Sequence, residues 1–163
     1  MRLFIAVLLS DAMRRALLDT QADMRRQNVR GSYAPPENLH LTLAFIGDYG
    51  DPEAVAEALP PFEPFDLSLS GMGAFGDLWW AGIAPSAPLS DYVRRLRHAL
   101  AEAGIPFDRK RFSPHITLVR RATGQPVVAP PAAGMTVRRV SLMRSDRGKS
   151  GMIYTEIGGV DSV

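Results

Sequence analysis

Hydrophobic and polar positions follow a helical period in two parts of the chain. Residues Asp11–Gln27 and Leu89–Ala103 carry apolar side chains every three or four positions, which predicts two amphipathic helices. Ser10 stands where the first helix needs a cap, and Gly104 follows the second helix, where it can end it. A shorter helix is expected from Pro52 to Leu59, because proline is favoured at a first helical position.

Strands are expected where β-favouring residues run between turn signals. The expected strands are Met1–Leu9, His40–Ile46, Phe65–Leu69, Leu78–Ala84, His115–Arg120, Met135–Arg144 and Gly151–Ile157. The polar run Ser145–Ser150 predicts a turn before the last of them, and the proline- and glycine-rich run Thr123–Gly134 predicts a loop.

The two halves of the chain repeat this order of elements. His40-Leu41-Thr42-Leu43 returns as His115-Ile116-Thr117-Leu118, 75 positions later (115 − 40). Other positions align at nearly the same offset: Ile5 with Trp80, Met13 with Leu89, and Phe65–Leu69 with Val140–Arg144. Each half reads strand, helix, His-Thr strand, connector, strand. We therefore expect one α+β domain over residues 1–163, with two like lobes about a pseudo-two-fold axis and both histidines in the cleft between them.

The repeated strand offers an imidazole and a hydroxyl on one face, because residues two apart on a strand point to the same side. Histidine has a pKa near 6.5, so one of His40 and His115 can accept a proton while the other donates one. The hydroxyls of Thr42 and Thr117 are uncharged donors that suit the oxygens of a bound anion. This combination favours transfer at a phosphate, and a strained cyclic phosphodiester would need no metal.

Other histidine chemistry fits the sequence less well. A metal site at His40 and His115 would leave the threonines unexplained, and the chain has no His-x-x-x-His pair. We expect neither a metal nor another cofactor. His98 lies on the polar side of its predicted helix beside Arg94 and Arg95, and we assign it no role.

Basic residues flank the second motif. Arg109, Lys110 and Arg111 precede it and Arg120 follows it, either as a funnel for a polyanion or as a solvated charged loop. Strict alternation places Arg120 on the face opposite His115 unless the strand ends or bulges there. The same rule points Phe45 toward the core. Three other aromatic residues are candidates to stack on a base: Tyr33, Phe75 and Tyr154.

Composition narrows the function classes. The chain is 46% apolar and 22% charged, the balance of a globular protein, and no apolar run approaches the roughly 18 residues of a membrane helix. It has no cysteine, which excludes disulfides, thiolate catalysis and cysteine-ligated metals and favours a cytoplasmic location. Lys110 and Lys149 are the only lysines among 19 basic residues, so arginine, the better bidentate partner for phosphate, dominates.

Two longer segments resemble a known family. Pro35–Gly47 (PPENLHLTLAFIG) and Phe112–Arg120 (FSPHITLVR) resemble the two signature motifs of the two-histidine phosphoesterases. The most similar members are the RNA 2',3'-cyclic phosphodiesterases, also called the 2'-5' RNA ligase family. The opening RLFIAV, the stretch Trp79–Gly82 and the late Arg144–Ser145 also fit. Before the first motif's proline, members often have an aromatic residue followed by valine. This chain has Tyr33-Ala34 there, so it departs from the pattern at Ala34.

The resemblance implies a bilobal α+β fold with antiparallel sheets around a central cleft. It implies metal-independent hydrolysis of a 2',3'-cyclic phosphate at an RNA end to a 2'-phosphomonoester. His40 would donate a proton to the departing 3' oxygen, His115 would activate water, and Thr42 and Thr117 would hold phosphate oxygens. The expected partners are RNA ends, tRNA fragments among them, and we expect a monomer without a membrane partner. Tyr33, Arg109–Arg111 and Arg120 are candidate RNA contacts.

Several alternatives stay open at this point. Relatives are named for joining tRNA halves through a 2'-5' linkage, the reverse reaction. The substrate could instead be a 2'-5' oligonucleotide or cyclic ADP-ribose phosphate. A module that binds RNA ends or nucleotides without turnover and a structural protein with a fortuitous repeat are the rivals from other classes.

Overall fold

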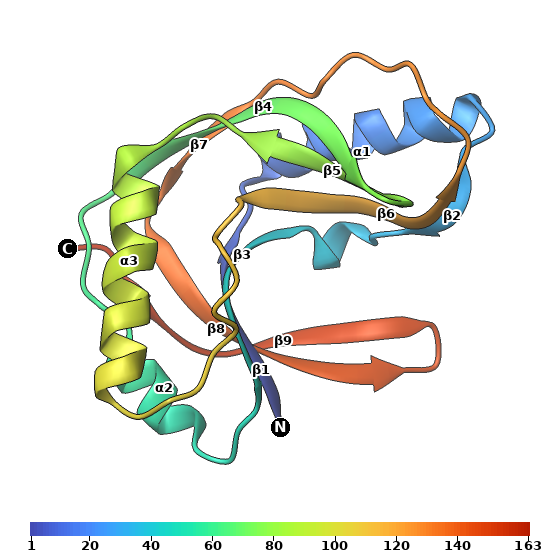
Figure 1. Cartoon of the computed structure of the whole chain (residues 1–163). Coiled ribbons are helices and arrows are strands. Elements are labelled where there is room, and N and C mark those ends of the chain that lie inside the picture. The colour runs from blue at the N-terminus through green and yellow to red at the C-terminus, as the bar shows by residue number, and fades with distance from the viewer.

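Two antiparallel sheets and three α-helices make up the computed structural model, which describes residues 1–163 (Figure 1). The first sheet has the order β3-β1-β8-β9 and the second β2-β6-β5-β4-β7. The first consists of β1 (Arg2–Leu8), β3 (His40–Asp48), β8 (Arg139–Gly148) and β9 (Gly151–Asp161). The second consists of β2 (Arg30–Tyr33), β4 (Phe65–Phe75), β5 (Leu78–Ile83), β6 (His115–Thr123) and β7 (Gly134–Val137). An α+β fold with antiparallel sheets is thus confirmed.

The three helices form where the sequence predicts them. They are α1 (Asp11–Arg26), α2 (Pro52–Ala58) and α3 (Ala87–Glu102), and a 3-10 turn covers Pro36–Asn38. The Ser10 hydroxyl accepts a hydrogen bond from the Met13 N–H at 3.2 Å, so the predicted cap of α1 is confirmed. None of the helices has both the length and the apolar character needed to cross a membrane.

Each sheet is built from both halves of the chain. In the first sheet β1 pairs with β3 from its own half and with β8 from the other half. In the second sheet β5 pairs with β6 and also with β4 from the first half. The helices cross over as well, because α1 contacts β6 and β7 whereas α3 contacts β3. The repeated order of elements is therefore present, but the halves exchange elements. The first half gives β2, β4 and its long helix to the second sheet, and the second half gives β8, β9 and its long helix to the first sheet.

Three strand predictions need correction. The segment Met135–Arg144, predicted as one strand, is divided at Arg138 between β7 and β8, which belong to different sheets. No glycine or proline marks this change of sheet. The predicted turn Ser145–Ser150 is mostly strand, since β8 stays paired with β9 until Gly148 and forms a long hairpin with it (Figure 1). The short strand β2 was not predicted.

The main hydrophobic core joins the two sheets and the helices. It contains 32 buried residues, and on β1 it takes Leu3, Ile5 and Val7. The alternate residues Phe4 and Ala6 are buried on the other side of the strand, in a separate small cluster. We call this second side the inner face of the first sheet, and the side of the second sheet that carries His115 the inner face of that sheet. The inner faces carry the candidate site.

Candidate active site

His40 opens β3 and is held at both ring nitrogens. Its Nδ1 lies 2.7 Å from the Asn38 carbonyl oxygen, which can only accept, so Nδ1 carries a hydrogen. Its Nε2 lies 2.8 Å from the Thr42 hydroxyl, which donates to the neutral imidazole. Asn38 closes the 3-10 turn before the strand, so the sequence just before the motif sets the orientation of the ring.

His115 opens β6 in a similar way but has one nitrogen free. Its Nδ1 lies 2.7 Å from the Ser113 carbonyl oxygen, again two residues back in the chain. Its Nε2 makes no hydrogen bond within the chain. A neutral His115 therefore presents an unshared lone pair at Nε2, which suits a proton acceptor. Thr117 lies on the same face and pairs with Trp80 of β5.

Aromatic rings surround each imidazole. Phe4 and Tyr154 lie 5.0 and 5.3 Å from His40 between ring centroids, whereas Phe75 lies 5.3 Å from His115, edge to face. Phe75 and Tyr154, candidates for stacking on a base, thus lie beside the histidines. Phe4 and Trp80 had no predicted role near the site, although Trp80 lies 6.3 Å from His115.

The sequence does not predict these two aromatic neighbours because it does not give the strand register. That register pairs Trp80 with Thr117 and Ala6 with Thr42. The sequence alignment of Ile5 with Trp80 is therefore wrong by one residue.

Two reciprocal backbone contacts bring the His-Thr strands together. The Ala34 N–H, from the segment before His40, donates to Leu118 of β6 at 3.0 Å. The Asp108 N–H, from the segment before His115, donates to Phe45 of β3 at 2.9 Å. Each histidine strand is therefore bonded to the segment that precedes the other histidine, and β3 lies against β6.

The pKa of His40 reports how its neighbours are placed. Burial lowers this pKa below the usual value of 6.5, and the positive charges of Arg120 and His115 lower it further, against the opposing hydrogen bond to the Asn38 carbonyl. Arg120 and His115 thus lie close enough to His40 to influence its protonation. The lowered pKa favours the neutral form of His40.

A β-bulge follows each His-Thr pair. In β6, Thr117 pairs with Trp80 and Val119 with Trp79, so Leu118 is an extra residue. Leu118 and Val119 are both buried and Arg120 is exposed. The bulge shifts the alternation by one position and places Arg120 on the inner face. This is the case foreseen in the sequence, in which Arg120 shares a face with His115 if the strand bulges before it.

The equivalent bulge in β3 overturns the prediction for Phe45. Ala6 pairs with Thr42 and Ile5 with Ala44, so Leu43 is the extra residue. Phe45 is 55% exposed and its ring lies 6.4 Å from that of Phe4 on the inner face. The expectation that Phe45 points into the core is wrong for this reason.

The remaining candidate RNA contacts fall into two groups, an exposed loop and one side chain that packs within the fold. Arg109, Lys110 and Arg111 are exposed in the loop before β6, and the Arg109 guanidinium lies 4.6 Å from the ring of Phe107. Tyr33 is engaged within the fold: its hydroxyl donates to the Val29 carbonyl at 2.7 Å, and the Arg25 guanidinium covers its ring at 4.1 Å. Packing accounts for these contacts of Tyr33 without a ligand.

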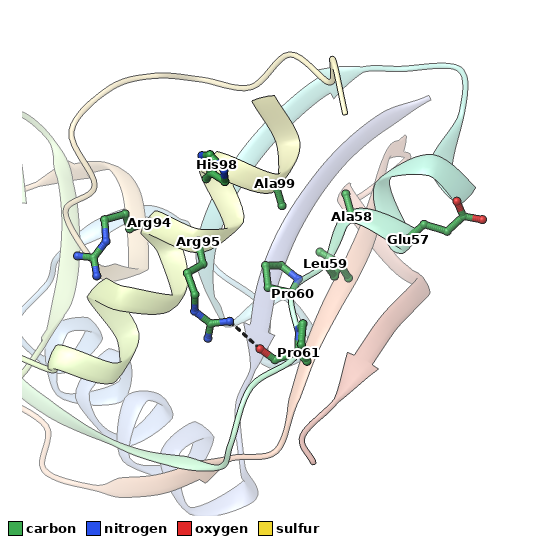
Figure 2. Close-up of a pocket in the computed structure, with 9 residues that line it drawn as sticks. All are labelled: Glu57, Ala58, Leu59, Pro60, Pro61, Arg94, Arg95, His98 and Ala99. Carbon is green, nitrogen blue, oxygen red and sulfur yellow. Dashed lines mark hydrogen bonds between the residues drawn. The ribbon is translucent and has the colours of Figure 1, made fainter. Parts of the chain in front are cut away.

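A pocket of about 640 Å³ lies apart from the histidine pair (Figure 2). It is formed by α3 and the segment from the end of α2 to Pro61, and the Arg95 guanidinium donates to the Pro61 carbonyl at its rim at 2.8 Å. His98 lines it with its Nε2 3.8 Å from a Glu102 oxygen. None of the predicted site residues lies there. No group of three or more His, Cys, Asp or Glu side chains is arranged to hold a metal ion.

Comparisons with known proteins find relatives over most of the chain. The RNA 2',3'-cyclic phosphodiesterase of Thermus thermophilus is 35% identical over 175 residues, covering 95% of this chain and 87% of that protein. The protein of the same name from Methanothermobacter thermautotrophicus is 29% identical over 177 residues, with 96% of both chains covered. The crystal structure of Escherichia coli LigT superposes with a TM-score of 0.84 at 27% identity, over 99% of this chain and 96% of that one. LigT has also been crystallised with 3'-AMP and with phosphate. The model of the 2'-5' RNA ligase superfamily matches residues 13–149, and the chain belongs to that superfamily.

Proposed function

We propose that this protein hydrolyses the 2',3'-cyclic phosphate at an RNA end to a 2'-phosphomonoester without a metal. The observation that carries the proposal is the pair of like His-Thr units. Each imidazole is fixed through Nδ1 by the carbonyl two residues back, at 2.7 Å in both cases, so each directs Nε2 away from the backbone. Two imidazoles held in this way can work as an acid–base pair.

In the proposed reaction the two histidines act at opposite ends of the phosphate. His115 Nε2 takes a proton from water as the water oxygen bonds to phosphorus. The bond from phosphorus to the 3' oxygen breaks, and His40 Nε2 gives that oxygen a proton. The products are a 2'-phosphomonoester and a free 3' hydroxyl. Thr42, Thr117 and Arg120 supply donors and positive charge for the other phosphate oxygens, where charge builds up.

The free Nε2 of His115 supports its assignment as the acceptor, and the family resemblance gives the same assignment. His40 must carry a proton to act as the donor, yet its surroundings in the fold lower its pKa. A bound phosphodiester carries negative charge next to the ring and raises that pKa again. Binding of the substrate thus prepares the donor.

The comparisons support the substrate class. Relatives over most of this chain are named for RNA 2',3'-cyclic phosphodiesterase activity. Binding of 3'-AMP and phosphate by LigT supports a nucleotide phosphate as the ligand here. The superfamily name also favours the reverse joining of RNA ends through a 2'-5' linkage as a second activity of the same site.

The test is product formation from a 2',3'-cyclic nucleotide in excess chelator. We expect the 2'-monophosphate, and we expect His40→Ala and His115→Ala each to lower the rate by about 10²-fold or more, because each removes one proton transfer. His98→Ala is the matched control and should keep the wild-type rate. Loss of activity on chelation, or full activity in His115→Ala, would contradict the mechanism. Tight binding without product would favour a binding module.

The same assay with other substrates separates the open alternatives. Rates on a 2'-5' oligonucleotide and on cyclic ADP-ribose phosphate should fall below the rate on the 2',3'-cyclic end. Incubation of the 2',3'-cyclic and 5'-hydroxyl fragments at high concentration tests joining. A higher rate on either rival substrate would reassign the substrate while leaving the acid–base pair in place.

A further inference from the structure

Gln21 is a buried polar side chain that faces the bulge of β6 from α1. It is 1% exposed, and its Nε2 donates to the Leu118 carbonyl at 2.9 Å and to the Ala34 carbonyl at 3.0 Å. Both neighbours are acceptors only, so the amide nitrogen must face them and uses both of its hydrogens. A buried amide with this geometry holds two chain segments at once.

The contacts of Gln21 close a small ring of hydrogen bonds. The Ala34 N–H donates to the same Leu118 oxygen at 3.0 Å, so Leu118, Ala34 and Gln21 are bonded in all three combinations. Leu118 is the extra residue of the bulge. Arg120 lies two residues further on and faces the inner side only because of that bulge. These three hydrogen bonds therefore hold the β6 bulge, and the bulge sets the direction of Arg120.

The other half of the chain has a simpler version of this contact. Arg97 of α3 donates to the Lys110 carbonyl at 2.7 Å. Arg97 and Lys110 follow Gln21 and Ala34 by the same 76 positions (97 − 21 and 110 − 34). A bond from the helix to the segment before the histidine is thus common to both halves. Only Gln21 also reaches a bulge, that of β6. An arginine, Arg120, follows the bulge in β6, whereas none follows the bulge in β3.

We propose that Gln21 is a positioning residue: it holds the β6 bulge in register and thereby keeps Arg120 directed at the two-histidine site. Without the amide, β6 loses the bond that ties the extra residue to α1, and its register near Leu118 is less strongly fixed. Arg120 then spends less time near His40. The consequence for turnover rests on the proposed function, whereas the consequence for His40 does not.

The first test measures the His40 pKa by NMR titration of the imidazole in the ligand-free protein. Arg120→Ala should raise this pKa, because a positive charge next to the ring is removed. Gln21→Met should raise it in the same direction and add no further rise in the Arg120→Ala background. Thr20→Val is the matched control, since Thr20 is buried on the same helix and its hydroxyl donates only to the Ala16 carbonyl. This control should leave the His40 pKa in place.

The second test is a double-mutant cycle on hydrolysis of a 2',3'-cyclic nucleotide. Gln21→Met should lower kcat/KM by about tenfold in the wild-type background and by less than about twofold with Arg120→Ala, the non-additivity expected of coupled residues. Gln21→Asn, which keeps the donors on a shorter chain, should recover part of the loss. Thr20→Val should lower thermal stability without changing kcat/KM.

The outcomes separate this inference from the proposed function. A His40 pKa that responds to Arg120→Ala but not to folded Gln21→Met overturns the positioning role, as does an equal kinetic loss in both backgrounds. If Arg120→Ala leaves the His40 pKa unchanged, the positioning role is also overturned. If the wild-type protein hydrolyses no cyclic phosphate, the proposed function fails, and the titration alone still decides whether Gln21 directs Arg120.

Discussion

At the scale of single residues, the two histidines differ although their motifs match. His40 has its Nε2 bonded to Thr42 and its ring against those of Phe4 and Tyr154, whereas Nε2 of His115 is free. The motifs alone cannot distinguish donor from acceptor, because the sequence around them is repeated. The distinction comes from the different rings and charges that the fold places around each imidazole.

An acid–base pair of this kind predicts a bell-shaped dependence of kcat/KM on pH. His115 must be neutral to accept a proton and His40 must be charged to donate one, so activity falls on both sides of an optimum. The measurement is kcat/KM for a 2',3'-cyclic nucleotide between about pH 5 and 9. The rate of His98→Ala should follow the wild-type profile. A profile that stays flat between about pH 5 and 8 would exclude the pair.

The lowered pKa of His40 also predicts how stability depends on pH. The unfolded chain has the higher pKa, about 6.5, and so binds more protons than the folded protein just below that pH. The free energy of unfolding contributed by His40 is therefore present above pH 6.5 and is lost as the pH falls through the lower folded value. Urea unfolding at about pH 7.5 and 5.5 should show a smaller loss for His40→Gln than for wild type. An equal loss would mean that His40 is not held neutral.

At the scale of elements, the two bulges decide which side chains reach the site. Alternation correctly gives the shared face of His and Thr, because the two residues lie two positions apart and no extra residue interrupts the strand between them. It fails three residues later, at Phe45, because one extra residue reverses every side chain beyond it. No glycine or proline in the sequence marks these two bulges, because the extra residues are Leu43 and Leu118.

The bulge in β3 makes a testable contrast between neighbouring residues. Phe45→Ala should change the free energy of unfolding little, by roughly 1 kcal/mol or less, because the ring is largely exposed. Leu43→Ala should cost about 2–5 kcal/mol, because Leu43 is 1% exposed in the core. Urea denaturation of both variants compares them directly. A larger loss for Phe45→Ala would restore the simple alternation and contradict the bulge.

At the scale of the whole molecule, the exchange of strands and helices makes the two halves depend on each other. The first sheet needs β8 and the second needs β4, so neither half can complete a sheet alone. Fragments 1–76 and 77–163 should each be largely unfolded by circular dichroism and should gain structure and activity on mixing. A fragment that folds cooperatively by itself would show that the lobes are independent.

The sequence by itself determined the local elements and the reacting groups. Apolar periodicity located the two long helices and a proline located the short one. Turn signals bounded most strands, and repetition of His-x-Thr selected His40, Thr42, His115 and Thr117, because these features depend on neighbours close in the chain. The tertiary structure alone decided what depends on distant segments: the division of Met135–Arg144 between two sheets, the exchange of strands, the bulges, and the aromatic rings and Arg120 around the imidazoles. Strand register depends on pairing between residues far apart in the chain, and a one-residue shift leaves the local pattern almost unchanged while it reverses the face of each side chain.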